Sequence, residues 1–254
     1  MLIRSIHAME DLPSIHALVQ SHPLGVLTTG IASPPGDYPF LQSSHIPWVL
    51  DVDPNNPDDL GTLRGHIARQ NPQAKAMIES LEEGEQELKD EVLVLFTAPA
   101  QSYVTPKYYT FTKPSTGKVV PTYDYSAVQV YGRLTLHHAD TPSTSSFLHS
   151  QMSALSQQEE ERAGFPGDSA WKITDAPEGY IKQLKRAVVG LEIRIERAEG
   201  KVKAQQEMRA EDREGVVKGF RGLGTELGKE MSEVTEREGR RVEEAKKAKK
   251  AAAA

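Results

Sequence analysis

Two short segments carry many polar and aromatic side chains for stretches that otherwise look like β-strands. The first, residues 63–72, runs Leu-Arg-Gly-His-Ile-Ala-Arg-Gln-Asn-Pro and passes from a strand into the start of a helix. A cation at such a corner lies beside backbone N–H groups and the positive end of the helix dipole, which together favour an anion such as phosphate. The segment therefore predicts a phosphate-binding corner at Arg69, Gln70 and Asn71. Asn71 is also expected to cap the helix that begins at Pro72.

The second segment, residues 119–132, runs Val-Val-Pro-Thr-Tyr-Asp-Tyr-Ser-Ala-Val-Gln-Val-Tyr-Gly. Its aromatic rings could stack on a planar ligand or fill an interface between subunits. Tyr123, Tyr125 and Gln129 are therefore candidates for one wall of a binding site. For His66, in the first segment, ligand contact and a purely structural role are both open.

Composition limits the classes of chemistry. The chain has 254 residues, is 38% hydrophobic and carries a formal net charge of -6, which argues against broad nucleic-acid binding through a basic surface. It has no cysteine, so disulfides, thiolate metal sites and a cysteine nucleophile are excluded. His137 and His138 are adjacent, so on a strand they point to opposite faces and cannot chelate one metal ion together. No metal site is predicted.

The sequence shows no sign of a membrane segment or a secretory leader. No run approaches the roughly 18 apolar residues that a transmembrane helix needs. The first seven residues, Met-Leu-Ile-Arg-Ser-Ile-His, lack the basic-then-apolar pattern of a signal peptide. A cytoplasmic protein is the expectation.

The hydrophobic pattern predicts many short strands with few helices between them. Closely spaced strands of this kind favour a β-barrel with peripheral helices over a doubly wound sheet, so the predicted class is α+β, mainly β. Strands are expected at residues 24–29, 41–50, 62–69, 92–96, 102–106, 119–120, 127–137 and 190–195, and helices at 14–20, 72–81, 147–163 and 177–189.

The character of the sequence changes near residue 200. We predict a barrel domain over residues 1–200 and a helical extension over residues 201–254. In the extension, apolar residues recur at helical spacing as one stripe, although several glycines weaken that helix. The final Lys-Lys-Ala-Lys-Lys and four alanines form a low-complexity tail, for which a solvated or disordered end is expected.

Several motifs occur in a fixed order along the chain. They are Ser-His-x-Pro at 44–47, Gly-His-x-Ala-Arg-x-Asn-Pro at 65–72, and Val-Pro-Thr-aromatic-x-Tyr-x-Ala-Val-x-Val-Tyr-Gly at 120–132. With further stretches at 171–177, 187–193 and 199–203, they make the chain resemble the PaiB family over roughly residues 1–222. That family is known as FMN-binding negative transcriptional regulators with a split-barrel flavin-binding fold. One departure is Asp124, which stands where the family motif usually has a neutral Asn.

The resemblance implies FMN as the cofactor. Its phosphate would lie near Arg69 and the helix that starts at Pro72. The isoalloxazine ring would lie between the strand at residues 43–47 and the region at residues 123–129. The resemblance also implies a homodimer with cofactor pockets at the subunit boundary. The cofactor-binding residues predicted in this way are Ser43, Ser44, His45, Ile46, Pro47, His66, Arg69, Gln70, Asn71, Tyr123, Tyr125 and Gln129.

Three functions remain open from the sequence. The family name implies a transcriptional regulator, although the chain shows no helix-turn-helix signal or basic recognition helix, so direct DNA binding is not expected. A flavin-dependent oxidoreductase that takes hydride from NADH or NADPH is the second. The third is a haem-binding or haem-degrading protein, in which His45 or His66 would be an axial ligand.

Overall fold

The computed structural model describes residues 1–9, 11–34 and 37–252. The chain divides into two compact units. Unit 1 comprises residues 1–10, 97–127 and 199–254, and unit 2 comprises residues 11–96 and 128–198. Unit 1 thus combines the C-terminal segment, which begins at residue 199, with two segments from within the range predicted as the barrel domain. Two long strands, β7 (Thr122–His137) and β8 (Val188–Lys203), contribute residues to both units.

Unit 2 is a β-barrel that closes through one bent segment of chain. Residues 41–51 form two strands separated only by Trp48. The first of them pairs with β1 and the second pairs with β4, so the sheet order β2-β1-β5-β7-β8-β4-β3 begins and ends in the same segment. The remaining strands of unit 2 are β1 (Leu24–Gly30), β2 (Leu41–Pro47), β3 (Val49–Asp51), β4 (Thr62–Ala68) and β5 (Val92–Thr97).

Buried and less buried side chains alternate along the strands, and the buried ones fill the barrel with apolar groups. Trp48 is 1% exposed, and its ring lies against Gly65, where a Cβ atom would approach the ring to 2.9 Å. The residues buried with it include Leu27, Leu63, Val94, Phe96, Leu134, Leu136, Leu191 and Ile193. The mainly β α+β fold predicted from the strand spacing is therefore confirmed.

The helices of unit 2 begin where the sequence supplies caps. The side chain of Asp11 accepts a hydrogen bond from the Ser14 N–H at the start of α1, and Asn71 caps α2 in the same way. Helix α4 lies against β3 and β4. The helices are α1 (Leu12–Ser21), α2 (Pro72–Glu79), α4 (Pro142–Arg162) and α5 (Glu178–Arg186), with short 3₁₀ turns η3 (Gly167–Ser169) and η4 (Ile173–Asp175).

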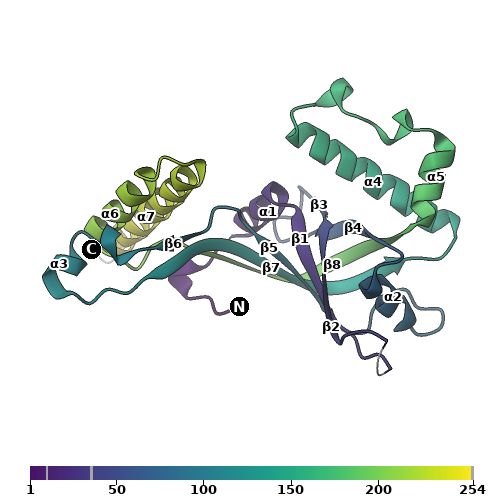
Figure 1. Ribbon diagram of the computed structural model, residues 1–254, viewed down its shortest axis with the longest axis horizontal. Helices are drawn as coiled ribbons and strands as arrows, with labels where there is room; N and C mark the ends of the chain where they lie inside the picture. Colours follow the sequence, from purple (N-terminus) through teal and green to yellow (C-terminus); the bar gives the residue numbers. More distant parts are fainter. Residues whose placement is uncertain (10, 35–36, 253–254) are drawn as a thin grey trace. The chain divides into compact units, whose positions relative to one another are not determined.

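Unit 1 has its own small core. Val104, Tyr109, Val216, Phe220 and Met231 pack together. They come from a short strand, the turn that follows it and two C-terminal helices, α6 and α7, which lie side by side (Figure 1). The elements are η1 (Ser5–His7), β6 (Ser102–Val104), η2 (Pro106–Tyr108), α3 (Thr112–Thr116), α6 (Ala210–Arg221) and α7 (Glu226–Ala252).

The C-terminal stripe belongs to two helices rather than one. The chain turns between α6 and α7, where Gly224 has a left-handed φ of 65° that a glycine adopts at little cost. Leu223 and Leu227, which the stripe would bury, are 50% and 42% exposed at this turn. The lysines of the tail are exposed, as expected, but they lie within the last turns of α7. None of the described helices combines the length and the apolarity that crossing a membrane requires.

Candidate functional site

One hydrogen bond joins the two predicted binding segments of unit 2. The side-chain amide of Asn71 donates from Nδ2 to Ser44 Oγ at 3.1 Å, while its Oδ1 accepts from the Gln73 N–H at 2.8 Å. Asn71 therefore caps α2 and at the same time ties the start of that helix to β2. The strand at 43–47 and the corner at 69–71 are therefore in contact, although they lie far apart in sequence.

The predicted residues of β2 point to opposite faces of the strand. Ser44 and Ile46 point inward, and Ile46 is only 3% exposed. Ser43 and His45 lie on the outer face and are exposed. Ser43 Oγ lies 2.9 Å from Thr28 Oγ1 on the neighbouring strand β1. A ligand that approaches from outside the barrel therefore meets Ser43, His45 and Thr28, with half-buried Pro47 at the end of the strand.

Arg69 is held rigidly at the end of β4. Its Nη2 donates to the carbonyl oxygens of His138 at 2.8 Å and Val188 at 3.2 Å, and its Nε donates to that of Arg186 at 3.2 Å. These contacts place a fixed positive charge beside α2 and against the last residue of α5. Among the described residues no acceptor is recorded for Nη1, and the neighbouring Gln70 is exposed.

The same corner contains amide atoms without partners. Gln73, which is 1% exposed, donates from Nε2 to Leu27 O, Thr29 Oγ1 and Gln42 O. Its Oε1 and the Nε2 of Gln42 have no hydrogen-bond partner among the described residues. A buried polar atom left unpaired costs about 1–3 kcal/mol. The corner therefore has hydrogen-bonding capacity that its own side chains do not use.

His66 lies in a different environment, between β4 and α4. Its Nδ1 is 2.8 Å from Oε1 of Gln151, which is fully buried. A neighbouring pair joins His137 Nε2 to Glu192 Oε2 at 2.9 Å, and the hydrogen bond from His137 lowers the pKa of Glu192. His66 therefore lies between β4 and α4 with a buried partner, whereas His45 is exposed on the outer face of β2.

The third predicted segment divides between the two units. Gln129 belongs to unit 2, where its Oε1 accepts a hydrogen bond from the Tyr131 hydroxyl at 3.2 Å. Tyr123 and Tyr125 belong to unit 1. Tyr123 forms an edge-to-face pair with Tyr103, and Lys201 lies over the ring of Tyr125.

Sequence reasoning missed Thr28, Gln42 and Gln73 as parts of the corner. Thr28 is opposite Ser43 in the β1–β2 register, and Gln42 is opposite Thr29. Only the pairing of the strands places these residues beside the predicted ones. Gln73 did carry a signal, because it follows the capping Asn71 by two residues and so lies in the first turn of α2.

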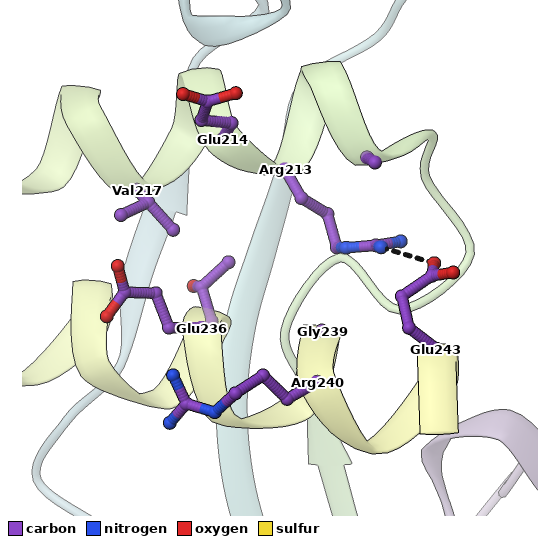
Figure 2. A pocket seen from close by; sticks show the side chains of 9 residues that line it. Arg213, Glu214, Val217, Glu236, Gly239, Arg240 and Glu243 are labelled. Carbon is purple, nitrogen blue, oxygen red and sulfur yellow. Dashed lines mark hydrogen bonds and ion pairs between the residues drawn. The ribbon is translucent and has the colours of Figure 1, made fainter. Parts of the chain in front are cut away.

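A groove in unit 1 is lined by none of the predicted residues (Figure 2). It has a volume of about 280 Å³ and lies between α6 and α7, with Gly239 and Val217 on its walls. Arg213 lines it as well, but this guanidinium already donates to Glu243 Oε1 at 2.7 Å and to Met208 O at 2.6 Å. Its cation is therefore already paired within unit 1.

Comparison with known proteins identifies the family. The model of the family described as "Putative FMN-binding domain" matches residues 1–197. The chain belongs to this family. FMN is the cofactor that membership assigns to it, in agreement with the resemblance seen in the sequence.

The relatives of this FMN-binding-domain protein include fungal and bacterial chains. An uncharacterized protein of Aspergillus fumigatus is 47% identical over 258 residues, which cover 94% of this chain and 98% of that one. The protease synthase and sporulation protein PAI 2 of Bacillus subtilis is 24% identical over 194 residues, covering 76% and 79% of the two chains. Among solved structures, the flavocytochrome Anf3 of Azotobacter vinelandii has a TM-score of 0.43 at 13% identity, covering 79% of this chain and 72% of that one.

The residues of the corner fit the chemistry of FMN. A flavin nucleotide needs a cation and N–H groups for its phosphate, and donors and acceptors for the edge of its ring. Arg69 supplies a fixed cation at the corner. The exposed Ser43 and His45 supply hydrogen-bonding groups on the outer face of β2, and between them in the chain Ser44 accepts from Asn71 on the other face.

Proposed function

We propose that the chain binds FMN at the corner where β2 meets the connection between β4 and α2. The phosphate lies towards Arg69, and the ring lies along the outer face of β2 at Ser43 and His45. The observation that carries this proposal is the hydrogen bond between Asn71 and Ser44, because it brings the predicted phosphate segment and the predicted ring segment into contact.

The positioning of Arg69 supports its role towards the phosphate. A side chain held by three carbonyl oxygens loses little further conformational entropy when an anion arrives. The guanidinium stays charged throughout, and charge-assisted hydrogen bonds to phosphate are roughly twice as strong as neutral ones. The residues of this chain therefore bind and orient the nucleotide, and the flavin supplies the redox chemistry when bound.

We further propose that a second copy of the chain covers the outer face of β1 and β2. Three large apolar side chains lie exposed on or next to these two strands: Leu24 at 59%, Phe40 at 60% and Leu41 at 67%. Leu41 pairs with Gly30, and Leu24 pairs with Pro47, at the two ends of the β1–β2 ladder. Covering this face by a second copy would remove the apolar surface from water and exclude solvent from the ring.

Titration of the apoprotein with FMN, followed by flavin fluorescence, tests the site. His45→Ala should weaken FMN binding about fivefold to tenfold, as expected for loss of one hydrogen bond of roughly 1 kcal/mol. The matched control is His149→Ala, since His149 is also exposed but lies on α4. Equal affinities for the two variants would contradict the proposed position of the ring.

Sedimentation velocity tests the second copy. Leu41→Glu places a charge on the exposed apolar face, so it should convert a dimer into a monomer and weaken FMN binding in parallel. Leu223→Glu, at a similarly exposed leucine in unit 1, is the control and should leave both unchanged. A wild-type chain that sediments as a monomer at every concentration would contradict this part of the proposal.

For the biological role, we propose regulation rather than turnover as the main use of the flavin. The support is the name of the Bacillus subtilis relative, which connects that protein with protease synthesis and sporulation. Stopped-flow reduction separates the two uses. Rapid reduction of the bound flavin by NADH or NADPH, with repeated turnover, would favour the oxidoreductase instead.

A further inference from the structure

Three tyrosines, two of them exposed and Tyr125 half-buried, lie on one face of the sheet of unit 1. Tyr103 of β6 is directly opposite Tyr123 of β7, and their ring centroids are 6.1 Å apart in an edge-to-face arrangement. Tyr125 follows on the same face of β7, because side chains two residues apart point the same way. Tyr103 is 48% exposed and Tyr123 is 58% exposed. We call Tyr103, Tyr123 and Tyr125 the tyrosine face; β6 and β7 run side by side in Figure 1.

The opposite side of these strands is the buried one. Val104 and Asp124 are both fully buried, which fixes the direction in which the tyrosines point. Shifting the register by one residue would bury the rings and expose this core. The tyrosines are therefore held outward by the packing of the core on the other side.

Two lysines of β8 border the tyrosine face. The ammonium of Lys201 lies 5.1 Å from the ring centroid of Tyr125. Lys203 donates from Nζ to the carbonyl oxygen of Tyr123 at 2.8 Å and also contacts Thr122 Oγ1. The ammonium group of Lys201 thus lies beside the Tyr125 ring, and that of Lys203 lies beside the backbone of Tyr123.

The two units differ in net charge, although the chain as a whole is acidic. Unit 1 has 18 lysines and arginines against 14 acids, whereas unit 2 has 12 against 22. The excess of four in unit 1 equals the four lysines at residues 246–250 of α7, so the cations at the tyrosine face itself are Lys201 and Lys203. The excess of acids that argues against binding a polyanion lies in unit 2.

From these observations we infer that the tyrosine face binds single-stranded nucleic acid, with bases stacked on the tyrosine rings and phosphates near Lys201. Every base has a flat π-face, so stacking on exposed aromatic rings of a sheet is tolerant of sequence. Single strands are the suitable form because their bases are free to stack, whereas the bases of a duplex are already stacked on each other. The inference goes beyond the proposed FMN binding, because it concerns residues of unit 1, whereas the FMN corner proposed above is built from residues of unit 2.

Fluorescence anisotropy of a labelled oligo(dT) of about 12 nucleotides, a length within known single-strand site sizes, provides the test. The full-length chain should bind it, and a duplex of the same length should bind at least tenfold more weakly. Tyr123→Ala and Tyr103→Ala should each weaken binding of the single strand by about tenfold or more, the usual effect of losing one base stack. Tyr123→Phe should retain the affinity, because the ring that stacks is kept.

The chain offers a matched control in Tyr180, which is 55% exposed on α5 of unit 2. Tyr180→Ala should bind the oligonucleotide like the wild type. Lys201→Gln should reduce the dependence of log affinity on log salt by about 0.7, the contribution of one phosphate contact on a single strand.

Four results would overturn the inference. The first is absence of binding up to about 100 µM at low salt, the weak end of non-specific affinity. The second is equal affinity of Tyr123→Ala and Tyr180→Ala. In the third, Tyr123→Ala loses FMN but keeps the oligonucleotide, which would make the tyrosine face a wall of the flavin site. In the fourth, the wild type is a dimer, and Tyr123→Ala becomes monomeric but still binds the oligonucleotide. The tyrosine face would then be an interface between copies of the chain.

Discussion

Asp124 is a buried carboxyl group to which, among the described residues, one side chain donates, and we expect it to make unit 1 sensitive to pH. Both of its oxygens accept from Nε2 of Gln205, at 2.8 and 2.9 Å. Gln205 reaches them from a left-handed backbone with φ of 62°, and its own Oε1 accepts from the Tyr109 hydroxyl. The charged groups that act on the carboxyl are Lys203, which favours its ionised form, and Glu207, which opposes it. Burial outweighs these partners and raises the pKa of Asp124 to about 7.

The direction of the pH effect follows from comparing the pKa of Asp124 in the unfolded and folded states. An aspartate in the unfolded chain loses its proton near pH 3.9, whereas folded Asp124 keeps its proton up to about pH 7. Between these values the unfolded state binds fewer protons, so the free energy of unfolding falls as pH rises. A pKa that folding raises from 3.8 to about 7 corresponds to a loss of roughly 4 kcal/mol, complete just above pH 7.

Asp124→Asn tests this reasoning, because asparagine has the shape of the protonated acid and stays neutral at every pH. Urea denaturation of both proteins between pH 4 and 8 should give similar free energies of unfolding near pH 4. The variant should then become the more stable protein as pH rises, by up to roughly 4 kcal/mol at pH 8. A difference that stays constant across this range would refute the reasoning.

Asp212 provides a control of opposite sign. It is also fully buried in unit 1, and burial alone would raise its pKa. Hydrogen bonds from the Thr112 hydroxyl and from the N–H groups of Phe111 and Thr112 prevail and lower the pKa instead. Asp212→Asn should therefore destabilise the chain at neutral pH, and the loss should shrink as pH falls below about 4.

Two further substitutions test the packing and the corner. Gly215→Ala places a Cβ atom 2.1 Å from the carbonyl oxygen of Tyr108, so it should lower the free energy of unfolding by about 3 kcal/mol in urea denaturation. Gly179→Ala, which meets nothing within 4 Å, should have no such cost, and equal losses would contradict the packing described for unit 1. Arg69→Lys keeps the charge but not the forked donors, so it should lower the midpoint of thermal unfolding and weaken FMN binding about tenfold or more. If the variant kept full FMN affinity, Arg69 would have only a structural role, through its hydrogen bonds to the three carbonyl oxygens.

Much of unit 2 could be predicted from local patterns. The caps at Asp11 and Asn71, the proline that opens α2 and the apolar run at Val92 each give a signal within a few residues. The closure of the barrel gives no such signal. It depends on the bend at Trp48, which sends one segment from pairing with β1 to pairing with β4. A pairing partner far along the chain cannot be read from the period of a single strand.

The site shows the same division between local and long-range information. The motif around Ser44 and the corner around Asn71 were both predicted, and the structure joins them. The sequence does not say which side of β2 faces outward, because Ser43 and Ser44 are chemically alike and adjacent. The buried neighbours Leu27 and Ile46 decide the matter, and Ser43 and His45 are left exposed on the outer face. The three carbonyl partners of Arg69 could not be predicted from the sequence either, because they belong to residues 138, 186 and 188, far along the chain.

The largest gap between sequence and structure concerns residues 97–127. Along the chain, Tyr123 and Tyr125 directly precede the strand predicted at residues 127–137, and the resemblance places them in a wall of the flavin site. In the structure their segment forms unit 1 together with the C-terminal helices, whose Val216 and Phe220 pack on Val104 and Tyr109, and their part in flavin binding stays a prediction. A charge averaged over 254 residues then describes neither unit, because the excess of acids lies in unit 2. Arguments from composition gain force when they are made for each compact unit, and for this chain they assign the excess of acids to unit 2, in which we propose the FMN corner.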